Sequence, residues 1–216
     1  MEQELFLKEE DRKDACFQNV NILYPNLFKG SDNPPIYGIK EFLSVEECNS
    51  LIDIAKDKMV KSFVVDDKNS ISDYRTSYTF FLTKDNSCFL QKKVSELLNV
   101  SIEQQELPQI TFYKYGQFYK EHYDHFNSTT ESGKNSLKNG GQRIATVLIY
   151  LNQPSEGGGT YFRKLGFKVK PRTGSTLLFF PTTLDGRYDP LTLHEAEEAK
   201  DDKWVCQIWI RQKETK

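Results

Sequence analysis

Several features are scarce in this sequence of 216 residues, and each scarcity narrows the choice of function. The four cysteines, at positions 16, 48, 88 and 206, form no Cys-x-x-Cys pair, which disfavours a zinc site or a disulfide framework and predicts reduced, mostly structural thiols. No run of about 18 apolar residues predicts a membrane-spanning helix. Residues 1–14 mix charges of both signs without the apolar run of a secretory signal. We therefore expect a cytoplasmic protein without a membrane partner.

An excess of positive charge is also missing. The chain has 29 Lys and Arg against 31 Asp and Glu, a formal net charge of −2, and the two signs alternate from end to end. Binding to nucleic acid through phosphate neutralisation requires a basic face, so we expect no nucleic-acid partner. Mixed charges of this kind are typical of a solvated protein surface.

The chain is long enough to bury the core of one domain, since 38% of its residues are hydrophobic. Residues 1–35 are predicted to form an N-terminal arm, because they are charged at first and then rich in turn-forming residues. We expect the catalytic domain to occupy residues 36–216. No internal repeat occurs.

Helices are predicted ahead of a series of strands. Ser44 and Glu47 form a capping-box pattern, and apolar residues recur at helical spacing as far as Met59, which predicts an amphipathic helix of about four turns. Ser62–Leu82 is expected to contain two strands around a polar turn at 66–70, and Asn86–Leu98 a second helix. Further strands are expected at Ile110–Tyr115, Phe118–Asp124, Arg143–Leu151, Thr160–Phe162, Phe167–Lys170, Ser175–Phe180 and Trp204–Arg211. This order predicts an α+β protein with a double-stranded β-helix (jelly-roll) core and supporting N-terminal helices.

Two connections between predicted strands are longer than a compact domain requires. Phe126–Gln142 is polar, and Pro181–Leu193 leads directly into His194. Long connections in a compact domain are either functional or disordered. Their positions beside candidate metal ligands favour a function as lids.

Histidine is scarce as well, with three residues, yet two of them fit one metal site. His122 and Asp124 lie two apart on a predicted strand, so both side chains point to one face. His194 completes two imidazoles and one carboxylate, the facial triad typical of Fe(II) oxygenases. A His-x-Asp pair alone also occurs on solvated surfaces. The remaining histidine, His125, is expected to be a loop or surface residue.

The last predicted strand has two different faces. Lys203, Val205, Gln207, Trp209 and Arg211 alternate with an entirely apolar set, Trp204, Cys206, Ile208 and Ile210. The first face is either exposed to solvent or lines a cavity, and alternation alone leaves both possibilities open. In a cavity, Lys203 would suit the far carboxylate of 2-oxoglutarate, the co-substrate of many Fe(II) oxygenases.

A set of motifs extends these observations along the chain from Glu41 to Gln212. They are Phe42–Cys48, Arg75–Ser77, Tyr113, Tyr115–Tyr119, His122–Asp124, Gly140–Leu151, Glu156–Phe162, Pro171–Gly174, His194 and Lys203–Val205. In this order they resemble the prolyl 4-hydroxylase family of 2-oxoglutarate- and Fe(II)-dependent dioxygenases, in particular its plant, algal and collagen-type branch. The resemblance covers most of the chain.

The resemblance implies an enzyme that hydroxylates prolyl residues of a peptide or protein and releases succinate and CO2. Its cofactors would be Fe(II), 2-oxoglutarate as co-substrate, and ascorbate as reductant. The residues to which it assigns roles are His122, Asp124 and His194 as iron ligands, Lys203, Tyr113 and Thr160 at the 2-oxoglutarate carboxylate, Tyr119, Arg143 and Trp209 around the reacting peptide, and Arg75 on a loop that folds over the peptide in relatives. Other branches of these oxygenases generally bind the co-substrate with an arginine. Lys203 therefore sets this chain apart from them, because lysine and arginine differ in geometry and are not interchangeable.

Three features depart from the family's pattern. The interval from His194 to Lys203 is one residue shorter than expected. Arg211 stands where close relatives have a histidine near the site, which indicates a different substrate pocket. Strict alternation from His122 turns Tyr119 away from the metal, and only a bulge or twist would return it.

Other functions remain open. A zinc-dependent hydrolase could use the same three ligands, although Lys203 would then be surplus. A catalytically silent module could keep the fold for peptide recognition. Within the enzyme class, lysyl residues or a free amino acid are alternative substrates. The sequence does not predict the oligomeric state.

Overall fold

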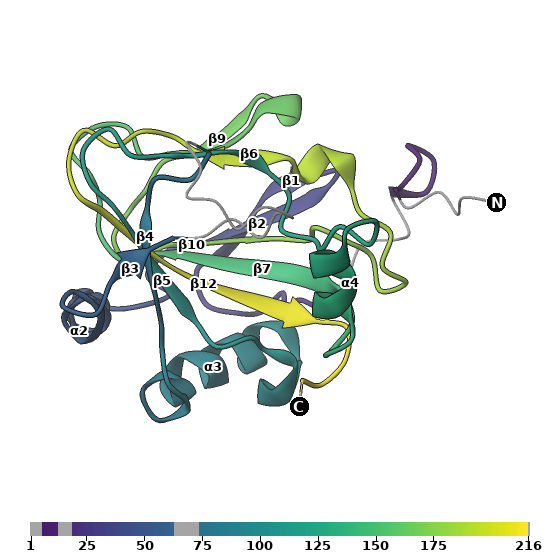
Figure 1. Cartoon of the computed structure of the whole chain (residues 1–216), viewed down its shortest axis with the longest axis horizontal. Coiled ribbons are helices and arrows are strands. Elements are labelled where there is room, and N and C mark those ends of the chain that lie inside the picture. The colour runs from purple at the N-terminus through teal and green to yellow at the C-terminus, as the bar shows by residue number, and fades with distance from the viewer. Residues whose placement is uncertain (1–5, 13–18, 63–73, 216) are drawn as a thin grey trace.

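The computed structural model describes residues 6–12, 19–62 and 74–215. Cys16 and the polar turn expected at 66–70 lie outside this part of the chain. Two antiparallel sheets form the body of the protein (Figure 1). The large sheet has the order β1 (Leu27–Asp32), β2 (Pro35–Ile39), β10 (Thr176–Phe179), β7 (Arg143–Tyr150), β12 (Lys203–Arg211), β5 (Gln109–Tyr113), β4 (Tyr78–Phe81) and β3 (Val60–Lys61). The small sheet has the order β6 (Tyr119–His122), β11 (His194–Ala196), β8 (Thr160–Phe162) and β9 (Phe167–Val169). This confirms the predicted jelly-roll core.

Helices cover the large sheet on the side away from the small sheet (Figure 1). Helix α2 (Val45–Ala55) begins at the predicted capping box, in which the Glu47 amide donates to Ser44 Oγ and the Ser44 amide donates to Glu47 Oε2. It ends before Met59 and is therefore shorter than expected. Helix α3 (Lys84–Leu98) begins two residues earlier than predicted, where the Thr83 amide donates to Asn86 Oδ1.

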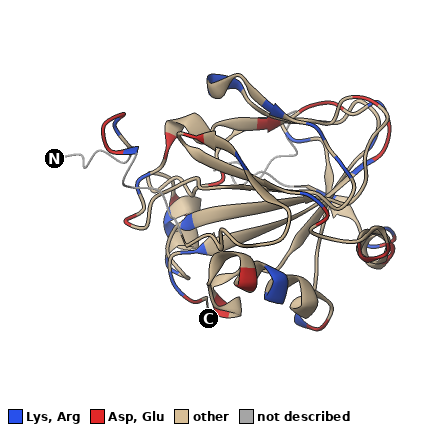
Figure 2. Ribbon diagram, turned by 180° about the vertical axis from the view of Figure 1, so that it is seen from behind, with Lys and Arg blue, Asp and Glu red and all other residues tan. Residues whose placement is uncertain are grey.

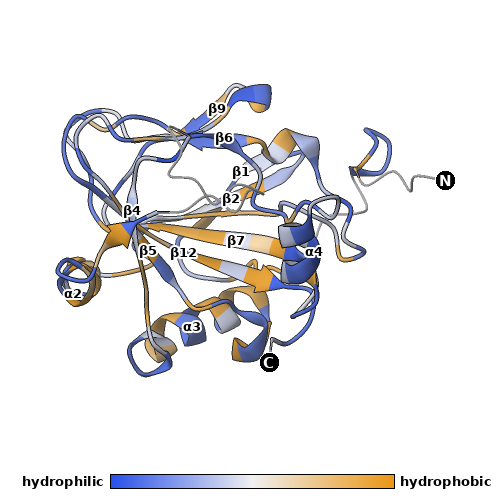
Figure 3. Ribbon diagram, in the orientation of Figure 1, coloured by the Kyte–Doolittle hydropathy of each residue, from blue (hydrophilic) through white to orange (hydrophobic). Residues whose placement is uncertain are grey.

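Two hydrophobic cores lie on the two faces of the large sheet. One is formed by α2, α3 and the outward faces of the central strands, and includes Cys206, Ile208 and Ile210. The other lies between the sheets and includes Tyr150 and Phe162. The central strands of the large sheet are accordingly apolar, while Figure 3 shows the connections as mostly hydrophilic. Basic residues (Lys and Arg) and acidic residues (Asp and Glu) are interspersed on the helices and loops (Figure 2).

Three features differ from the prediction. The expected domain boundary at residue 36 falls inside β2, and β1, assigned to the arm, pairs with β2 at the sheet edge. The connection Phe126–Gln142 contains a short helix, α4 (Glu131–Leu137), capped by Thr130 Oγ1, which accepts from the Gly133 amide. Strand β11 was missed because it has only three residues and directly follows a 3-10 turn, η3 (Pro190–Thr192).

The remaining short elements are the 3-10 turns η1 (Ile102–Gln104) and η2 (Arg163–Leu165). The three cysteines among the described residues, Cys48, Cys88 and Cys206, are free thiols, as predicted. None of the helices described here combines the length and the hydrophobicity needed to cross a bilayer.

Candidate active site

Pairing of β6 with β11 brings the three candidate ligands together. His194 lies directly opposite His122 in the antiparallel register, although the two residues are far apart in sequence. Asp124 follows the end of β6 and is buried. One ligand atom from each residue lies within 4.8 Å of the others. His122 Nε2 is 3.7 Å from Asp124 Oδ1, and His194 Nε2 is 3.9 Å from Asp124 Oδ2.

Asp124 reaches the cluster differently from the prediction. The argument from sequence placed His122 and Asp124 on one face of a continuous strand, but β6 ends at His122, and Asp124 lies in the bend that follows. The ladder ends there because β11 begins at His194, the partner of His122. The bend still turns the carboxylate toward both imidazoles.

The two imidazoles are oriented by backbone carbonyl groups. His122 Nδ1 is 2.8 Å from the Lys120 oxygen, and His194 Nδ1 is 2.8 Å from the Thr192 oxygen. A carbonyl oxygen only accepts, so each Nδ1 donates to it, and each Nε2 remains as the ring nitrogen that can bind a metal. Burial, reinforced by neighbouring His194, lowers the pKa of His122 to about 3, which keeps that ring neutral.

The carboxylate of Asp124 is ionised. Burial raises its pKa, but His194, His122 and Arg143, together with a hydrogen bond from Thr146, outweigh burial and hold the pKa below its usual value. Two imidazole nitrogens and one carboxylate are a donor set suited to a divalent transition metal such as Fe(II). The three residues therefore fit a metal.

A buried cation lies in the same barrel. Lys203 is 1% exposed at the start of β12, opposite Tyr113, and its ammonium lies 4.9 Å from the centre of the Tyr113 ring. Within the described parts of the chain no carboxylate lies within ion-pair distance of it. Burial lowers the pKa of Lys203 to about 7, with Glu197 acting in the opposite direction. A bound dicarboxylate would supply the missing negative charge.

Polar groups for such a ligand stand nearby. Thr160 is buried on β8 and lines the cavity with Lys203 and Tyr113. The Thr160 hydroxyl is 2.7 Å from the Tyr150 hydroxyl, which fixes its orientation. Four of the five residues on the predicted polar face of β12 thus line a cavity, namely Lys203, Val205, Gln207 and Trp209.

Tyr119 lies in the site because β6 contains an irregularity. His194 pairs with His122, and Ala196 pairs with Tyr119. The paired positions are therefore three residues apart on β6 but only two residues apart on β11. This extra residue reverses the alternation that would have turned Tyr119 away. The Tyr119 ring stacks on the His122 ring, with centroids 3.5 Å apart and planes at 11°. The bulge required by the sequence argument is therefore present.

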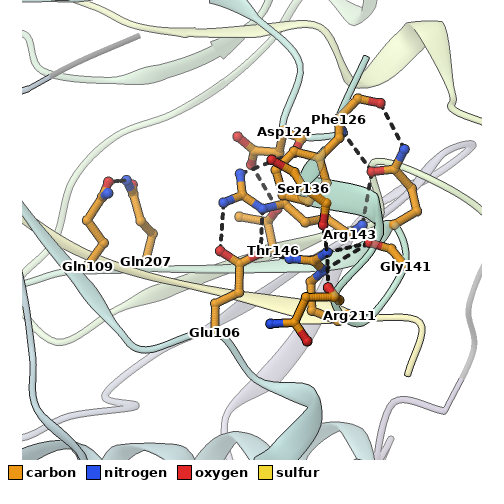
Figure 4. Close-up of polar contacts among 12 residues, drawn as sticks. Glu106, Gln109, Asp124, Phe126, Ser136, Gly141, Arg143, Thr146, Gln207 and Arg211 are labelled. Carbon is orange, nitrogen blue, oxygen red and sulfur yellow. Dashed lines mark hydrogen bonds and ion pairs between the residues drawn. The ribbon is translucent and has the colours of Figure 1, made fainter. Parts of the chain in front are cut away.

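Arg143 and Trp209 stand beside the cluster on adjacent strands, β7 and β12. The Arg143 guanidinium lies 3.7 Å from the centre of the Trp209 ring and donates to the Asp124 carbonyl oxygen at 3.3 Å. Two parallel hydrogen bonds of 2.7 Å join Arg143 to Glu106 (Figure 4). Trp209 Nε1 is buried without a hydrogen-bond partner among the described residues.

Arg75 occupies the interior instead of covering it. Its backbone bridges to Tyr119, and its buried side chain donates to Ser77 Oγ at 3.0 Å and to Gln109 Oε1 at 3.1 Å. Gln109 also accepts from Gln207 across the strands (Figure 4). Residues 63–73, which precede Arg75, lie outside the described residues.

A single cavity connects these groups. Its volume is about 1620 Å3, and all ten residues that the sequence analysis singled out line it, namely Arg75, Tyr113, Tyr119, His122, Asp124, Arg143, Thr160, His194, Lys203 and Trp209. The fold thus brings together side chains from six strands and the loops beside them.

Comparisons with known proteins agree with this geometry. Residues 108–211 match the family model of the 2OG-Fe(II) oxygenase superfamily. Prolyl 4-hydroxylase 1 of Arabidopsis thaliana is 36% identical over 225 residues, which cover 94% of this chain and 77% of the relative. The chain belongs to the prolyl 4-hydroxylase family.

A solved structure supports the same relationship. The viral collagen prolyl hydroxylase from Paramecium Bursaria Chlorella virus-1, in its 2-oxoglutarate complex, superimposes with a TM-score of 0.64 at 30% identity. The match covers 82% of this chain and 95% of the viral chain. A putative prolyl 4-hydroxylase of Acanthamoeba polyphaga mimivirus is 29% identical over 94% of this chain and 81% of the relative.

Sequence reasoning missed two residues that support this prolyl 4-hydroxylase site. Thr146 Oγ1 donates to Asp124 Oδ2 at 2.8 Å (Figure 4). Glu106 accepts from both Arg143 and Arg211. Thr146 had a visible signal, since it is the one polar residue within the aliphatic run Ile144–Ile149. Glu106 had none, because it lies in a polar connection far from its partners in sequence.

Arg211 fastens the long connection Phe126–Gln142. Its guanidinium donates to the carbonyl oxygens of Ser136, Asn139 and Gly141, and to Glu106 Oε1 (Figure 4). The Phe126 ring lies between two guanidinium groups, 4.5 Å from Arg143 and 4.6 Å from Arg211. Arg211, which stands where close relatives have a histidine, therefore holds the connection Phe126–Gln142, the expected lid, against the barrel.

His125 lies in a loop, as predicted. It is only partly exposed, and its ring stacks on Tyr188 with centroids 4.4 Å apart.

We predict that Thr146→Val weakens metal binding about tenfold, because it removes the hydrogen bond that orients the Asp124 carboxylate. Thr176→Val is the matched control, since the buried Thr176 hydroxyl has no partner among the described residues. Titration of each protein with Mn(II) measures the dissociation constant. Equal affinity of Thr146→Val and the unsubstituted protein would show that the carboxylate does not need this support.

For Arg211, we predict that the conservative change Arg211→Lys raises amide exchange across residues 131–142 and lowers the free energy of unfolding by about 1–3 kcal/mol. An ammonium cannot reach three carbonyl oxygens and Glu106 at once. Arg163→Lys is the control, because Arg163 is exposed and pairs with Glu121 and Glu195 on the surface. If both variants exchange alike, Arg211 does not hold this segment.

Proposed function

We propose that the protein hydroxylates prolyl residues within a peptide or protein, using Fe(II), O2 and 2-oxoglutarate and releasing succinate and CO2. The observation that carries this proposal is the convergence of His122, Asp124 and His194 in one cavity with the buried Lys203. Iron, when bound, would supply the oxidising chemistry that places one oxygen atom of O2 on the substrate and the other in succinate. Ascorbate would restore iron that becomes oxidised without a productive turnover.

The protein's own residues would hold and separate the reactants. His122, Asp124 and His194 occupy one side of a metal and leave its other positions open. Lys203 would bind the distal carboxylate of 2-oxoglutarate, with hydrogen bonds from Tyr113 and Thr160. The unpaired charge of Lys203 favours this co-substrate over a zinc hydrolase, which would have no use for it.

The substrate side of the cavity would be formed by Tyr119, Arg143 and Trp209. Arg143 is held by Glu106 beside the Trp209 ring, and Trp209 Nε1 has no partner among the described residues. A buried donor of this kind can satisfy a peptide carbonyl oxygen. Arg75 would complete this side of the pocket.

The size of the cavity supports a polypeptide substrate. Its volume of about 1620 Å3 exceeds the roughly 300–1,000 Å3 typical of small-ligand pockets. Its lining includes Lys58 near β3 and Phe81 of β4, and also Phe6 and Tyr188, besides the three candidate metal ligands. A free amino acid would fill only a small part of this cavity. A silent binding module would not require three intact ligands.

The direct test is to incubate the protein with Fe(II), 2-oxoglutarate, ascorbate and proline-rich, collagen-like and lysine-containing peptides. We expect a mass increase of one oxygen, located on proline by fragmentation, with one succinate for each hydroxylation. Asp124→Ala should abolish both products, whereas Asp53→Ala, on the exposed face of α2, should retain them. Oxygen on lysine would replace the prolyl assignment, and full activity of Asp124→Ala would exclude the triad.

For Lys203 we predict a dependence on pH. Its pKa of about 7 means that a rise from pH 6 to 8 removes the ammonium from the ligand-free protein, so 2-oxoglutarate affinity should fall over that range. Lys203→Ala should weaken binding by roughly ten- to a hundredfold at pH 6 and lose this pH dependence. Lys203→Arg should restore little of the affinity for 2-oxoglutarate, because the planar guanidinium of arginine does not fit the space that the lysine ammonium occupies.

Binding is measured anaerobically with Mn(II) as the metal. Lys56→Ala is the control, because Lys56 is exposed and pairs with Asp53 on the surface, away from the cavity lining. Unchanged 2-oxoglutarate affinity in Lys203→Ala would place the co-substrate elsewhere.

A further inference from the structure

The N-terminal segment 6–12 is attached to the loop that leads into His194. The Leu7 amide donates to the Tyr188 carbonyl oxygen at 2.9 Å, and the Leu7 side chain is buried. Arg12 Nε donates to Asp189 Oδ1 at 3.1 Å, and Arg187 pairs with Asp11 at 3.1 Å. Both ion pairs join the segment to Pro181–Leu193. The segment is therefore fixed to the catalytic domain at this point.

These contacts place Phe6 in a wall of aromatic rings. Tyr188 stands at its centre, with the His125 ring stacked on it at 4.4 Å and planes at 4°. Tyr123 meets Tyr188 at 5.5 Å and 61°, and Phe6 meets Tyr188 at 6.1 Å and 57°. The four rings come from three separate segments of the chain. We call Phe6, Tyr123, His125 and Tyr188 the aromatic wall.

The aromatic wall belongs to the same cavity as the metal ligands. All four of its residues line that cavity, and Tyr123 and His125 directly flank Asp124 in sequence. Phe6 is 45% exposed, so part of its ring is free to contact a ligand. A peptide that enters this cavity can therefore contact the metal ligands and the wall within one continuous space.

We propose that the aromatic wall is a second substrate subsite, which binds the ring of another proline flanking the one to be hydroxylated. This inference rests on the proposed prolyl hydroxylation and specifies its substrate as a segment with more than one proline. Aromatic-lined grooves recognise proline-rich segments because these segments are pre-ordered in the polyproline II conformation and lose little entropy on binding. The wall offers apolar ring faces and no acidic side chain, which suits a neutral pyrrolidine ring.

The geometry of polyproline II indicates the spacing. The helix has three residues per turn and rises about 3.1 Å per residue, so residues three apart present their rings on the same side, roughly 9 Å apart. A proline three positions from the target would then point in the same direction as the target. The structure leaves open whether this proline precedes or follows the target, and the experiment below tests both.

The test uses capped nine-residue peptides of serine and alanine with one central target proline. Two further peptides carry a second proline three residues before or three residues after the target. We expect the value of kcat/KM to be about tenfold higher for one of the two-proline peptides than for the one-proline peptide, chiefly through KM. In Phe6→Ala this ratio should fall below about twofold, and in Phe6→Trp, which keeps a ring, it should remain.

Phe28→Ala is the matched control, because Phe28 is 50% exposed on β1 and does not line the cavity. This variant should keep the tenfold ratio. A ratio near one in the unsubstituted protein, an unchanged ratio in Phe6→Ala, or an equal loss in Phe28→Ala would each overturn the subsite. The absence of oxygen addition to every peptide would instead contradict the proposed hydroxylation itself, so the two failures are distinguishable.

Discussion

The antiparallel pairing of β6 with β11 is the constraint on which the rest of the site depends. It places His194 opposite His122, and no local sequence pattern could bring these residues together. The small sheet has only four strands, and β11 has three residues, so its own hydrogen bonds are few. Its position is secured by packing, since Phe162 and Phe179 both contact the His194 ring. The hydrophobic core between the sheets thus supports the metal ligands directly.

The cations in and beside this cavity differ in their partners. Arg75 is buried and donates to Ser77 and Gln109. Arg143, which lines the cavity, and Arg211, which does not, share the carboxylate of Glu106 and donate to carbonyl oxygens as well. Lys203 has no such partner among the residues described. Taking an ion out of water costs several kcal/mol, and the fall of the Lys203 pKa to about 7 expresses that cost. The donors of the three arginines are taken up by the protein itself, whereas the ammonium of Lys203 remains available to an anionic ligand.

Much of the fold was predictable because the signals were local. The capping box at Ser44, the alternating faces of Lys203–Arg211 and the two candidate ligands of His122–Asp124 all arise within a few residues. The parts that were missed depend on distant contacts. The role of Glu106 depends on two arginines that lie far along the chain. Strand β11 is short and pairs with β6 on one side and β8 on the other. Helix α4 lies in a polar sequence, and its contact with Arg211, which donates to the Ser136 carbonyl oxygen, comes from a distant part of the chain.

The bulge in β6 links the metal ligands to substrate recognition. Without the extra residue, His122 and Tyr119 would project to opposite faces, because they are three apart on a strand. With it, the Tyr119 ring stacks on His122 and also lies 4.8 Å from the Arg75 guanidinium. The backbone bridge between Arg75 and Tyr119 joins β6 to the segment that enters β4 in the large sheet. One irregularity therefore sets both the packing around a metal ligand and the wall of the cavity facing it. A regular strand could supply one of these features but not both.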